Sequence, residues 1–387
     1  MVDYRSSRAL SGRRRRRYRL RGAPEERATS KLRAGLGAIP AAETGSARTI
    51  LFPRDPADLR GRRFLMVSAP FGPFGVALAE ALEAKGAEVR RMIFSAGDAF
   101  DWRRPGGIPF RASAEAWRVQ APSLLKDYTD IVIFGEGGAY NRAVLDLGDV
   151  LPARIWVLEN GYFRPDWITV ERNGVNGSSR LPRSREGYLA GPTEASPARS
   201  VGRILPHHVA NISLHHLAQM VGAPMFPRHA NHYTVSPWRQ CLGHVRRYLA
   251  LTFSGSAEGA VDLLIQRGPF FIACLQREGD AQLLRYSRYA DNTAFLAEVM
   301  RSSSAALSAL GFQTPVKVMG DAFFDFAGLT HQGVLDGFWT SPEGPDMDLF
   351  ARFRAHVIDR TQVNGNYHEP NALKSTAAGV VAVFQRG

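Results

Sequence analysis

The sequence predicts an α/β protein built on a parallel, doubly wound sheet. Short apolar runs alternate with helical segments from residue 64 onward, and a polar stretch follows each apolar run. This alternation is typical of βαβ units, in which a helix joins two parallel strands. Because open sheets of this kind bind ligands beyond the carboxyl ends of their strands, the polar stretches are the first candidates for a functional site.

The positive charge of the chain is concentrated in its first 48 residues. They hold 13 Lys and Arg against 4 Asp and Glu, a balance of +9, whereas the whole chain of 387 residues carries +13. Like charges at this density repel one another and resist compaction, so we expect residues 1–60 to form a disordered basic tail. The tail could bind nucleic acid, bind anionic lipid headgroups or have no role. No nucleic-acid-binding motif follows it, so we expect no nucleic-acid partner.

Cysteine content and hydropathy argue against a disulfide-rich secreted protein and against a membrane-spanning protein. Cys241 and Cys274 are the only cysteines, which is too few for a disulfide framework and favours free thiols in a reducing compartment. No run of 18 apolar residues is present, and the arginine-rich start lacks the apolar core of a secretory signal. These features predict a cytoplasmic protein whose contact with a membrane is at most peripheral.

The first βαβ unit is predicted over residues 64–94. We expect strands over 64–68 and 87–94, joined by a glycine- and proline-rich turn and a helix over 76–85. Gly72 and Gly75 in the turn do not complete the dinucleotide-binding fingerprint, so a nicotinamide cofactor is not expected. These glycines could permit close packing, or they could open a helix N-terminus that receives an anion.

Two further strands are predicted over 130–134 and 155–158, with a helix between them that ends near residue 147. The polar segment 159–183 follows the second of these strands. We expect the chain to leave the sheet at Pro165, which cannot continue a central strand. Further on, Asn173-Gly174 and Asn176-Gly177 are turn dipeptides that tolerate positive φ.

The rest of the chain predicts the following elements: helices over 201–220, 238–251, 292–300, 305–311, 346–359 and 372–384, and strands over 270–275 and 315–319. Six histidines fall between residues 207 and 232, and we expect them to be partnered or exposed rather than to bind a metal. The acidic pair Asp346 and Asp348 matches a metal-binding pattern of some sugar transferases. We interpret it instead as the acidic first turn of a helix, and expect no metal.

Seven segments of unusual sequence resemble one known family. They are Pro70–Phe74, Phe94–Asp98, Asn160–Arg183, Leu275–Gln282, Gly328–Gly333, Leu335–Trp339 and Thr361–Asn366. The family comprises bacterial capsule polysaccharide biosynthesis and export proteins that transfer 3-deoxy-manno-octulosonic acid (Kdo) in β linkage. The resemblance is to single-module members that add the first Kdo to a lysophosphatidylglycerol at the inner membrane, and so start the glycolipid linker of the capsule.

The resemblance implies two Rossmann-like domains in a GT-B-like arrangement. Residues 61–260 would form an acceptor-side domain, and residues 261–387 a donor-side domain with closing helices. It also implies a retaining transferase that uses CMP-Kdo as donor substrate and needs no cofactor. The implied partners are a lysophosphatidylglycerol or related lipid acceptor, an anionic membrane surface and other capsule assembly proteins. The protein would then be cytoplasmic and peripheral on the inner membrane.

The candidate catalytic residues are Asp280 and Glu159. Transfer with retention requires a carboxylate nucleophile and an acid/base partner. The resemblance places an aspartate at Asp280, and Glu159 follows a buried strand, where an acid/base group is expected. The alternative is that both are loop carboxylates paired with Arg164 or Arg277. The resemblance further suggests donor binding by Gln282, Ser302, Ser303 and Ser304, and substrate binding by Gly72, Arg164 and Asn176.

The chain departs from the family pattern after Met300. The resemblance implies a few dozen further residues there, including a His-Pro motif that handles the donor phosphate. Here Arg301 is followed at once by Ser302-Ser303-Ser304, which stand in place of an Asn-Ser-Thr triplet. We therefore expect a shortened second domain that lacks a β/α segment. The alternative function is that of a catalytically degenerate member that acts only as a binding or scaffold protein.

Overall fold

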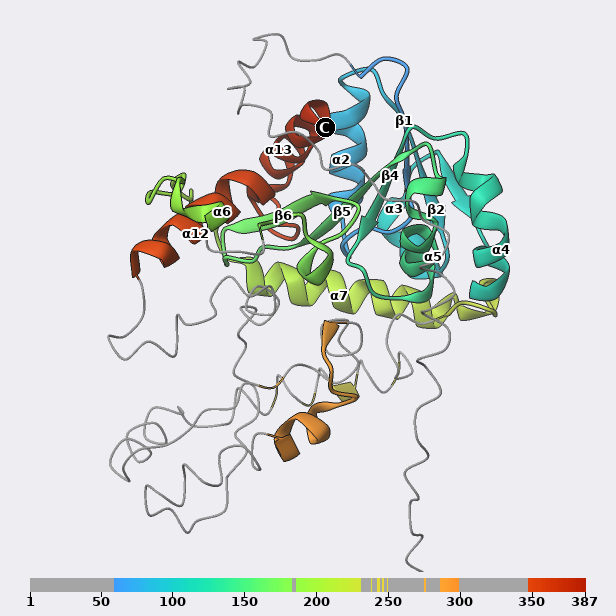
Figure 1. The fold of residues 1–387 in the computed structure, drawn as a ribbon. Helices are drawn as coiled ribbons and strands as arrows, with labels where there is room; N and C mark the ends of the chain where they lie inside the picture. Colours follow the sequence, from blue (N-terminus) through green and yellow to red (C-terminus); the bar gives the residue numbers. More distant parts are fainter. Residues whose placement is uncertain are drawn as a thin grey trace, which may run out of the picture. The chain divides into compact units, whose positions relative to one another are not determined.

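The computed structural model describes residues 59–182, 186–230, 286–298 and 347–387, with a few single positions between 238 and 275 (Figure 1). The basic tail and the predicted strands over 270–275 and 315–319 lie outside the described residues. So does nearly all of the predicted helix over 238–251.

A seven-stranded mixed sheet forms the centre of the described fold. Its strands, in spatial order, are β3 (Gly107–Pro109), β2 (Glu88–Ile93), β1 (Arg63–Met66), β4 (Asp130–Phe134), β5 (Arg154–Asn160), β6 (Trp167–Arg172) and β7 (Gln362–Asn364). The first five are parallel, which confirms the parallel sheet predicted from the alternating pattern. The last two are antiparallel to their neighbours. The fold is therefore α/β and compatible with a Rossmann-like domain.

Pro165 lies outside the strands, as predicted, but the prediction missed that the chain returns to the sheet directly after it. The chain turns through a cis Arg164-Pro165 bond and re-enters the sheet as β6, which pairs with β5. Proline cannot donate within a ladder, but here it lies in the turn, two residues before the strand begins. The side chains of Ile168 and Val170 join the apolar cluster on one face of the sheet.

Helices cover both faces of the sheet. They are α2 (Phe74–Glu83), α3 (Ala96–Trp102), α4 (Ala114–Leu125), α5 (Ala139–Leu147), α6 (Glu186–Leu189), α7 (Ile204–Val221), α12 (Met347–Thr361) and α13 (Leu373–Arg386). The described residues also include three short 3₁₀ helices, η2 (Gly148–Val150), η3 (Asn176–Ser178) and η4 (Ala223–Met225), and a helical segment over residues 292–298. The predicted helices over 76–85, 201–220, 346–359 and 372–384 are confirmed within a few residues, as is the one ending near 147.

Three of these helices, α3, α4 and the short α6, were not predicted. Helix α3 begins with a capping box, in which Ser95 and Asp98 satisfy each other's backbone N–H groups. Helix α4 is capped by Ser113 and contains Pro122 in its third turn, which interrupts the sequence pattern without ending the helix. The polar residues after the second strand therefore start a helix.

Two apolar clusters lie on opposite faces of the sheet. One packs α2 and α13 against strand residues such as Phe64 and Trp156. The other packs α4 and α5 against residues that include Ile131 and Ile155. Successive side chains of the central strands point alternately into one cluster and the other, as expected for a sheet buried on both faces.

The C-terminal segment completes this sheet (Figure 1). Strand β7 pairs with β6, and α13 packs alongside α2. The ring of Phe384 lies 4.6 Å from that of Trp156 and 5.6 Å from that of Phe64, measured between centroids. The closing helices α12 and α13, which were predicted to belong to the second domain, pack on the sheet of the first. The boundary near residue 260 lies outside the described residues and stays a prediction.

Candidate functional site

The carboxyl ends of β4 and β5 bring two glutamates to one edge of the sheet. Glu159 is the penultimate residue of β5 and is partly buried, while Glu136 lies two residues beyond β4 and is 2% exposed. The N–H of Gly135 donates to the carbonyl of Leu158 at 2.7 Å, which holds the two strand ends together. A Cβ on Gly135, where φ is 71°, would lie 3.2 Å from the Oε2 of Glu159. Glycine therefore leaves room for the Glu159 carboxylate.

A third glutamate, Glu171, lies on β6 directly opposite Val157 of β5. It is 8% exposed, and its carboxylate accepts hydrogen bonds from the hydroxyls of Tyr162 at 2.7 Å and Ser179 at 2.5 Å. Burial raises the pKa of Glu171 to about 7, and the two hydroxyl donors offset this only in part. The carboxyl group can therefore gain or lose a proton near neutral pH.

The two buried glutamates fix the loop over residues 173–181. Glu136 accepts from the N–H of Val175 at 2.9 Å, and the N–H of Asn176 donates to the hydroxyl of Tyr162 at 2.7 Å. Tyr162 in turn donates to Glu171, so the loop backbone is connected to both carboxylates. Such buried polar groups are stable only when each has a partner, and this network supplies them.

The predicted turn chemistry of this loop is confirmed at three of its four positions. Asn173 and Asn176 have φ of 66° and 53°, and Gly174 has φ of 157°. Gly177 does not need positive φ, but a Cβ there would lie 2.3 Å from the ring of Tyr286. Glycine is required at position 177 because an aromatic ring packs on its backbone.

Tyr286 links this loop to the later part of the chain. Its hydroxyl donates to Glu136, and the Oγ of Ser178 lies 2.5 Å from the same hydroxyl. The sequence analysis did not single out Tyr286, Glu136 or Glu171. Glu136 follows a predicted strand, so a signal for it was present. The other two are recognised only once the register of β6 and the fold of the loop are known.

Gly72 lies in the turn after β1, close to α7. Its φ is 94°, and a Cβ there would lie 2.5 Å from the side chain of Asn211. A Cβ on Gly97 would similarly lie 2.6 Å from the ring of His215. The sequence left two roles open for Gly72, close packing or an anion site at a helix N-terminus. The contact with Asn211 supports close packing, against α7. A substrate role for Gly72 stays a prediction.

Three histidines of α7 have polar partners, as the sequence predicted. The Nδ1 of His215 lies 2.7 Å from the Oδ2 of Asp101, and His207 lies 3.5 Å from Glu369. His208 and His368 share a 2.7 Å hydrogen bond between ring nitrogens. Burial and the neighbouring histidines lower the pKa of His368 to about 3, so its ring is neutral. Among the described residues, no group of three His, Cys, Asp or Glu side chains is arranged to hold a metal ion.

The structure places four of the predicted site residues at this edge. Glu159 and Arg164 flank the end of β5, Asn176 lies in the loop fixed by the buried glutamates, and Gly72 follows β1. Arg164 is exposed and donates from Nε to the carbonyl of Gly161 at 3.0 Å. The remaining predicted residues, Asp280, Gln282, Ser302, Ser303 and Ser304, lie outside the described residues, as does Arg277.

The arrangement can support proton transfer to or from a bound hydroxyl. Glu159 is only partly buried at the strand end, whereas Glu136 and Glu171 are enclosed and occupied in fixing the loop. A carboxylate held at a rigid strand end beside a fixed loop has the placement that general acid/base catalysis requires. The carboxylate of Glu159 itself accepts from the N–H of Asn160 at 2.9 Å. Glu159 thus stays the candidate for this role, and the two buried glutamates hold the loop beside it.

Known proteins similar to this chain are involved in capsule formation. A family model described as "Capsule polysaccharide biosynthesis protein" matches residues 129–306 and 299–368. The capsule polysaccharide export protein KpsS of Escherichia coli is 27% identical over 84% of this chain and its own full length. The capsule polysaccharide modification protein LipB of Neisseria meningitidis serogroup B is 24% identical over 81% of this chain and 94% of its own.

The two matched blocks of the family model overlap at residues 299–306. This is the place where the sequence analysis finds the chain shorter than the family pattern. In the part of the chain that is described, no helix is both long and apolar enough to cross a membrane.

Proposed function

Because the chain belongs to the capsule polysaccharide biosynthesis protein family, we propose that it is a glycosyltransferase of capsule assembly. The proposed reaction transfers Kdo from CMP-Kdo, in β linkage, to a lysophosphatidylglycerol or related lipid. The observation that carries this proposal is the position of Glu159, at the carboxyl end of β5 beside a loop fixed by two buried glutamates. The extent of the likeness to KpsS, over the full length of that protein, supports it.

Retention of configuration follows from two displacements at the anomeric carbon. In the first, the carboxylate of Asp280 attacks this carbon and CMP leaves with the bonding electron pair. In the second, the acceptor hydroxyl attacks the same carbon, its proton passes to Glu159, and the carboxylate of Asp280 is released. Each displacement inverts the anomeric carbon, so the net result is retention.

The remaining site residues are proposed to bind the two substrates. Gln282 and the serines Ser302, Ser303 and Ser304 would contact CMP-Kdo. They would belong to a donor-side domain, which together with the acceptor-side domain would form a GT-B-like pair. Gly72, Arg164 and Asn176 would contact the acceptor. Arg164 is exposed and permanently charged, so it suits a phosphate-bearing acceptor.

The acceptor also determines the proposed location. A lysophosphatidylglycerol is held in the membrane, so the protein would act from the cytoplasm as a peripheral protein on the inner membrane. Other capsule assembly proteins would then be its neighbours.

A second candidate function is a binding or scaffold role without catalysis. The shortened segment after Met300, where the two blocks of the family model overlap, favours this candidate. The His-Pro motif expected there handles the donor phosphate. We therefore expect the absence of this motif to weaken the binding of CMP-Kdo more than any other property of the protein.

One experiment separates the two candidates. The protein is incubated with CMP-Kdo and lysophosphatidylglycerol, and the lipid product is analysed by mass spectrometry for one added Kdo. In parallel, its melting temperature is measured with and without CMP, since a ligand that binds only the native state stabilises it. Transfer together with a CMP-dependent rise in melting temperature supports the transferase. A cooperative melt with no rise and no product favours the scaffold role.

A further inference from the structure

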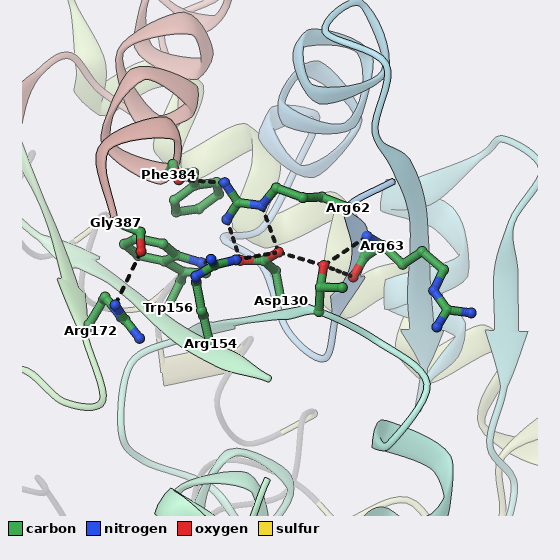
Figure 2. A network of polar contacts seen from close by, with 9 residues as sticks. Arg62, Arg63, Asp130, Arg154, Trp156, Arg172, Phe384 and Gly387 are labelled. Atoms are coloured by element: carbon green, nitrogen blue, oxygen red, sulfur yellow. Dashed lines mark hydrogen bonds and ion pairs between the residues drawn. The ribbon is translucent and has the colours of Figure 1, made fainter. Parts of the chain in front are cut away.

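A separate polar region lies at the opposite edge of the sheet, where the parallel strands begin (Figure 2). Strands β1, β4 and β5 start there with Arg63, Asp130 and Arg154, and the antiparallel β6 ends there at Arg172. Because strands run from this edge to the one that carries Glu159, the two edges are separate surfaces of the sheet.

Asp130 is the fully buried centre of this region. Its carboxylate accepts from two nitrogens of Arg62, from the indole N–H of Trp156 at 2.9 Å and from the hydroxyl of Thr129 at 2.7 Å. Burial alone would raise the pKa of Asp130, but these hydrogen bonds outweigh it and lower the pKa. The carboxylate is therefore ionised and already saturated with donors.

A pocket of about 480 Å³ opens beside this network. Its lining residues are Arg63, Lys126, Asp127, Tyr128, Thr129, Pro152, Arg154 and Arg172, which we call the amino-edge pocket. Four of these side chains are cationic and one is a carboxylate. The pocket wall thus carries a surplus of positive charge.

The neighbouring carboxylate of Asp130 compensates this surplus only in part. Arg154 forms an ion pair with Asp130 at 3.8 Å, beyond hydrogen-bond distance, and shares that one carboxylate with Arg62. Arg172 donates to the main-chain oxygen of Gly387, the last residue, at 3.2 Å, and its buried Nε has no hydrogen-bond partner among the described residues. Burial, together with repulsion from Arg154 and Arg180, lowers the pKa of Arg172. An anion in the pocket would relieve this repulsion.

We propose that the amino-edge pocket binds a phosphate group, either of a soluble phosphate ester or of a phospholipid headgroup. Guanidinium groups recognise phosphate oxygens through paired hydrogen bonds, and a lysine adds a point charge. Burial raises the pKa of Tyr128, so its hydroxyl remains a donor at neutral pH. This site is separate from the proposed transferase edge, and the inference does not depend on that function.

The test measures phosphate binding by the full chain and by three double variants. Arg154→Gln with Arg172→Gln removes two guanidinium groups from the pocket. Arg63→Gln with Lys126→Gln removes the two exposed cations of its wall, and keeps the test valid if the first pair disturbs folding. The control removes two exposed charges of α4 and α5 through Arg118→Gln with Arg142→Gln.

Calorimetric titration with inorganic phosphate at low salt gives the first readout. Co-sedimentation with phosphatidylglycerol vesicles, compared with neutral phosphatidylcholine vesicles, gives the second. Each pocket pair should weaken binding about tenfold or more, which corresponds to about 1.4 kcal/mol, and the control should weaken it far less. If the pocket variants bind inorganic phosphate more weakly, the site is open to soluble phosphate esters. If they lose only vesicle binding, the site binds a phospholipid headgroup. The proposal is overturned if the wild type binds in neither arm, or if the control loses as much as the pocket pairs.

Discussion

At the scale of single residues, two buried carboxyl groups on this sheet have opposite ionisation preferences. Asp130 accepts from Arg62, a cation, and its pKa is lowered, whereas Glu171 has only uncharged donors, two hydroxyls and the backbone of Arg180, and its pKa is raised to about 7. The difference follows from the partners, because hydroxyl hydrogen bonds compensate less of the desolvation cost than a guanidinium does. Each preference predicts a measurable effect on stability.

Glu171 should make the protein less stable as the pH rises through neutrality. Its folded pKa of about 7 exceeds the ordinary value of 4.5, so its favourable contribution is complete below about pH 4.5 and is lost as the pH rises through 7. Glu171→Gln keeps a neutral side chain at every pH. Its melting temperature relative to wild type should therefore improve from pH 5 to about pH 7 and level off above that.

The comparison variant for Glu171 is Glu80→Gln, which changes an exposed glutamate on α2. Its melting temperature should follow that of wild type across the same range. Parallel melting curves for wild type and Glu171→Gln would contradict the assignment.

Asp130→Ala should destabilise the fold by about 3 kcal/mol, since it leaves the partly buried Arg62 without its carboxylate. Urea unfolding monitored by circular dichroism measures this loss. Asp146→Ala breaks the exposed pair with Arg118 and should cost less than about 1 kcal/mol. An equal cost for the two substitutions would show that the Asp130 network contributes no more than a surface pair.

At the scale of elements, the apolar strands were predictable and the turns between them were less so. Strands β1, β2, β4 and β5 are short and mostly buried, and their pattern is local in the sequence. Strand β6 was missed because Pro165 indicates an exit from the sheet, although the proline falls in the turn. Strand β7 has only three residues, and its pairing joins segments about 200 residues apart, which local periodicity does not record.

In the candidate site, too, the residues that a local sequence pattern marks were predictable, and those brought in by distant contacts were not. Glu159 follows an apolar strand, so its place at the sheet edge could be inferred from sequence alone. Glu171 becomes part of the site only through the antiparallel register that sets it opposite Val157. Tyr286 reaches Glu136 across 150 residues, a contact that no local pattern contains.

The packing of α13 on the first sheet gives a prediction at this scale. Phe384 is fully buried between Phe64 and Trp156, so Phe384→Ala should cost about 3–5 kcal/mol of unfolding free energy. Lys374→Ala, an exposed change on the same helix, should cost under about 0.5 kcal/mol. A cost for Phe384→Ala as small as that of the lysine variant would mean that α13 is not part of this core.

At the scale of the whole molecule, the charge distribution bears on membrane contact. Residues 1–48 carry +9 of the total +13, and a headgroup surface attracts basic residues with about 1 kcal/mol each. This attraction falls off within a Debye length of roughly 8–10 Å and is weakened by salt. The proposed lipid acceptor requires such a surface, so binding to it should be electrostatic.

Binding to phosphatidylglycerol vesicles should therefore weaken steeply with added salt, and deletion of residues 1–48 should weaken it further. Co-sedimentation of the full chain and the shortened chain at low and high salt measures both effects. Circular dichroism of the shortened chain checks that the folded part is unchanged. Binding that is insensitive to salt and equal for the two chains would refute the electrostatic account.

The central claim is that Glu159 performs acid/base chemistry at the carboxyl edge of the sheet, and the initial rate of Kdo transfer tests it most directly. The rate is measured with CMP-Kdo and lysophosphatidylglycerol for wild type, for Glu159→Gln and for Glu115→Gln, an exposed glutamate on α4. We predict that Glu159→Gln lowers the rate by at least about 10²-fold at an unchanged melting temperature, whereas Glu115→Gln leaves the rate at the wild-type value. A Glu159→Gln variant that transfers Kdo as fast as wild type would contradict the account.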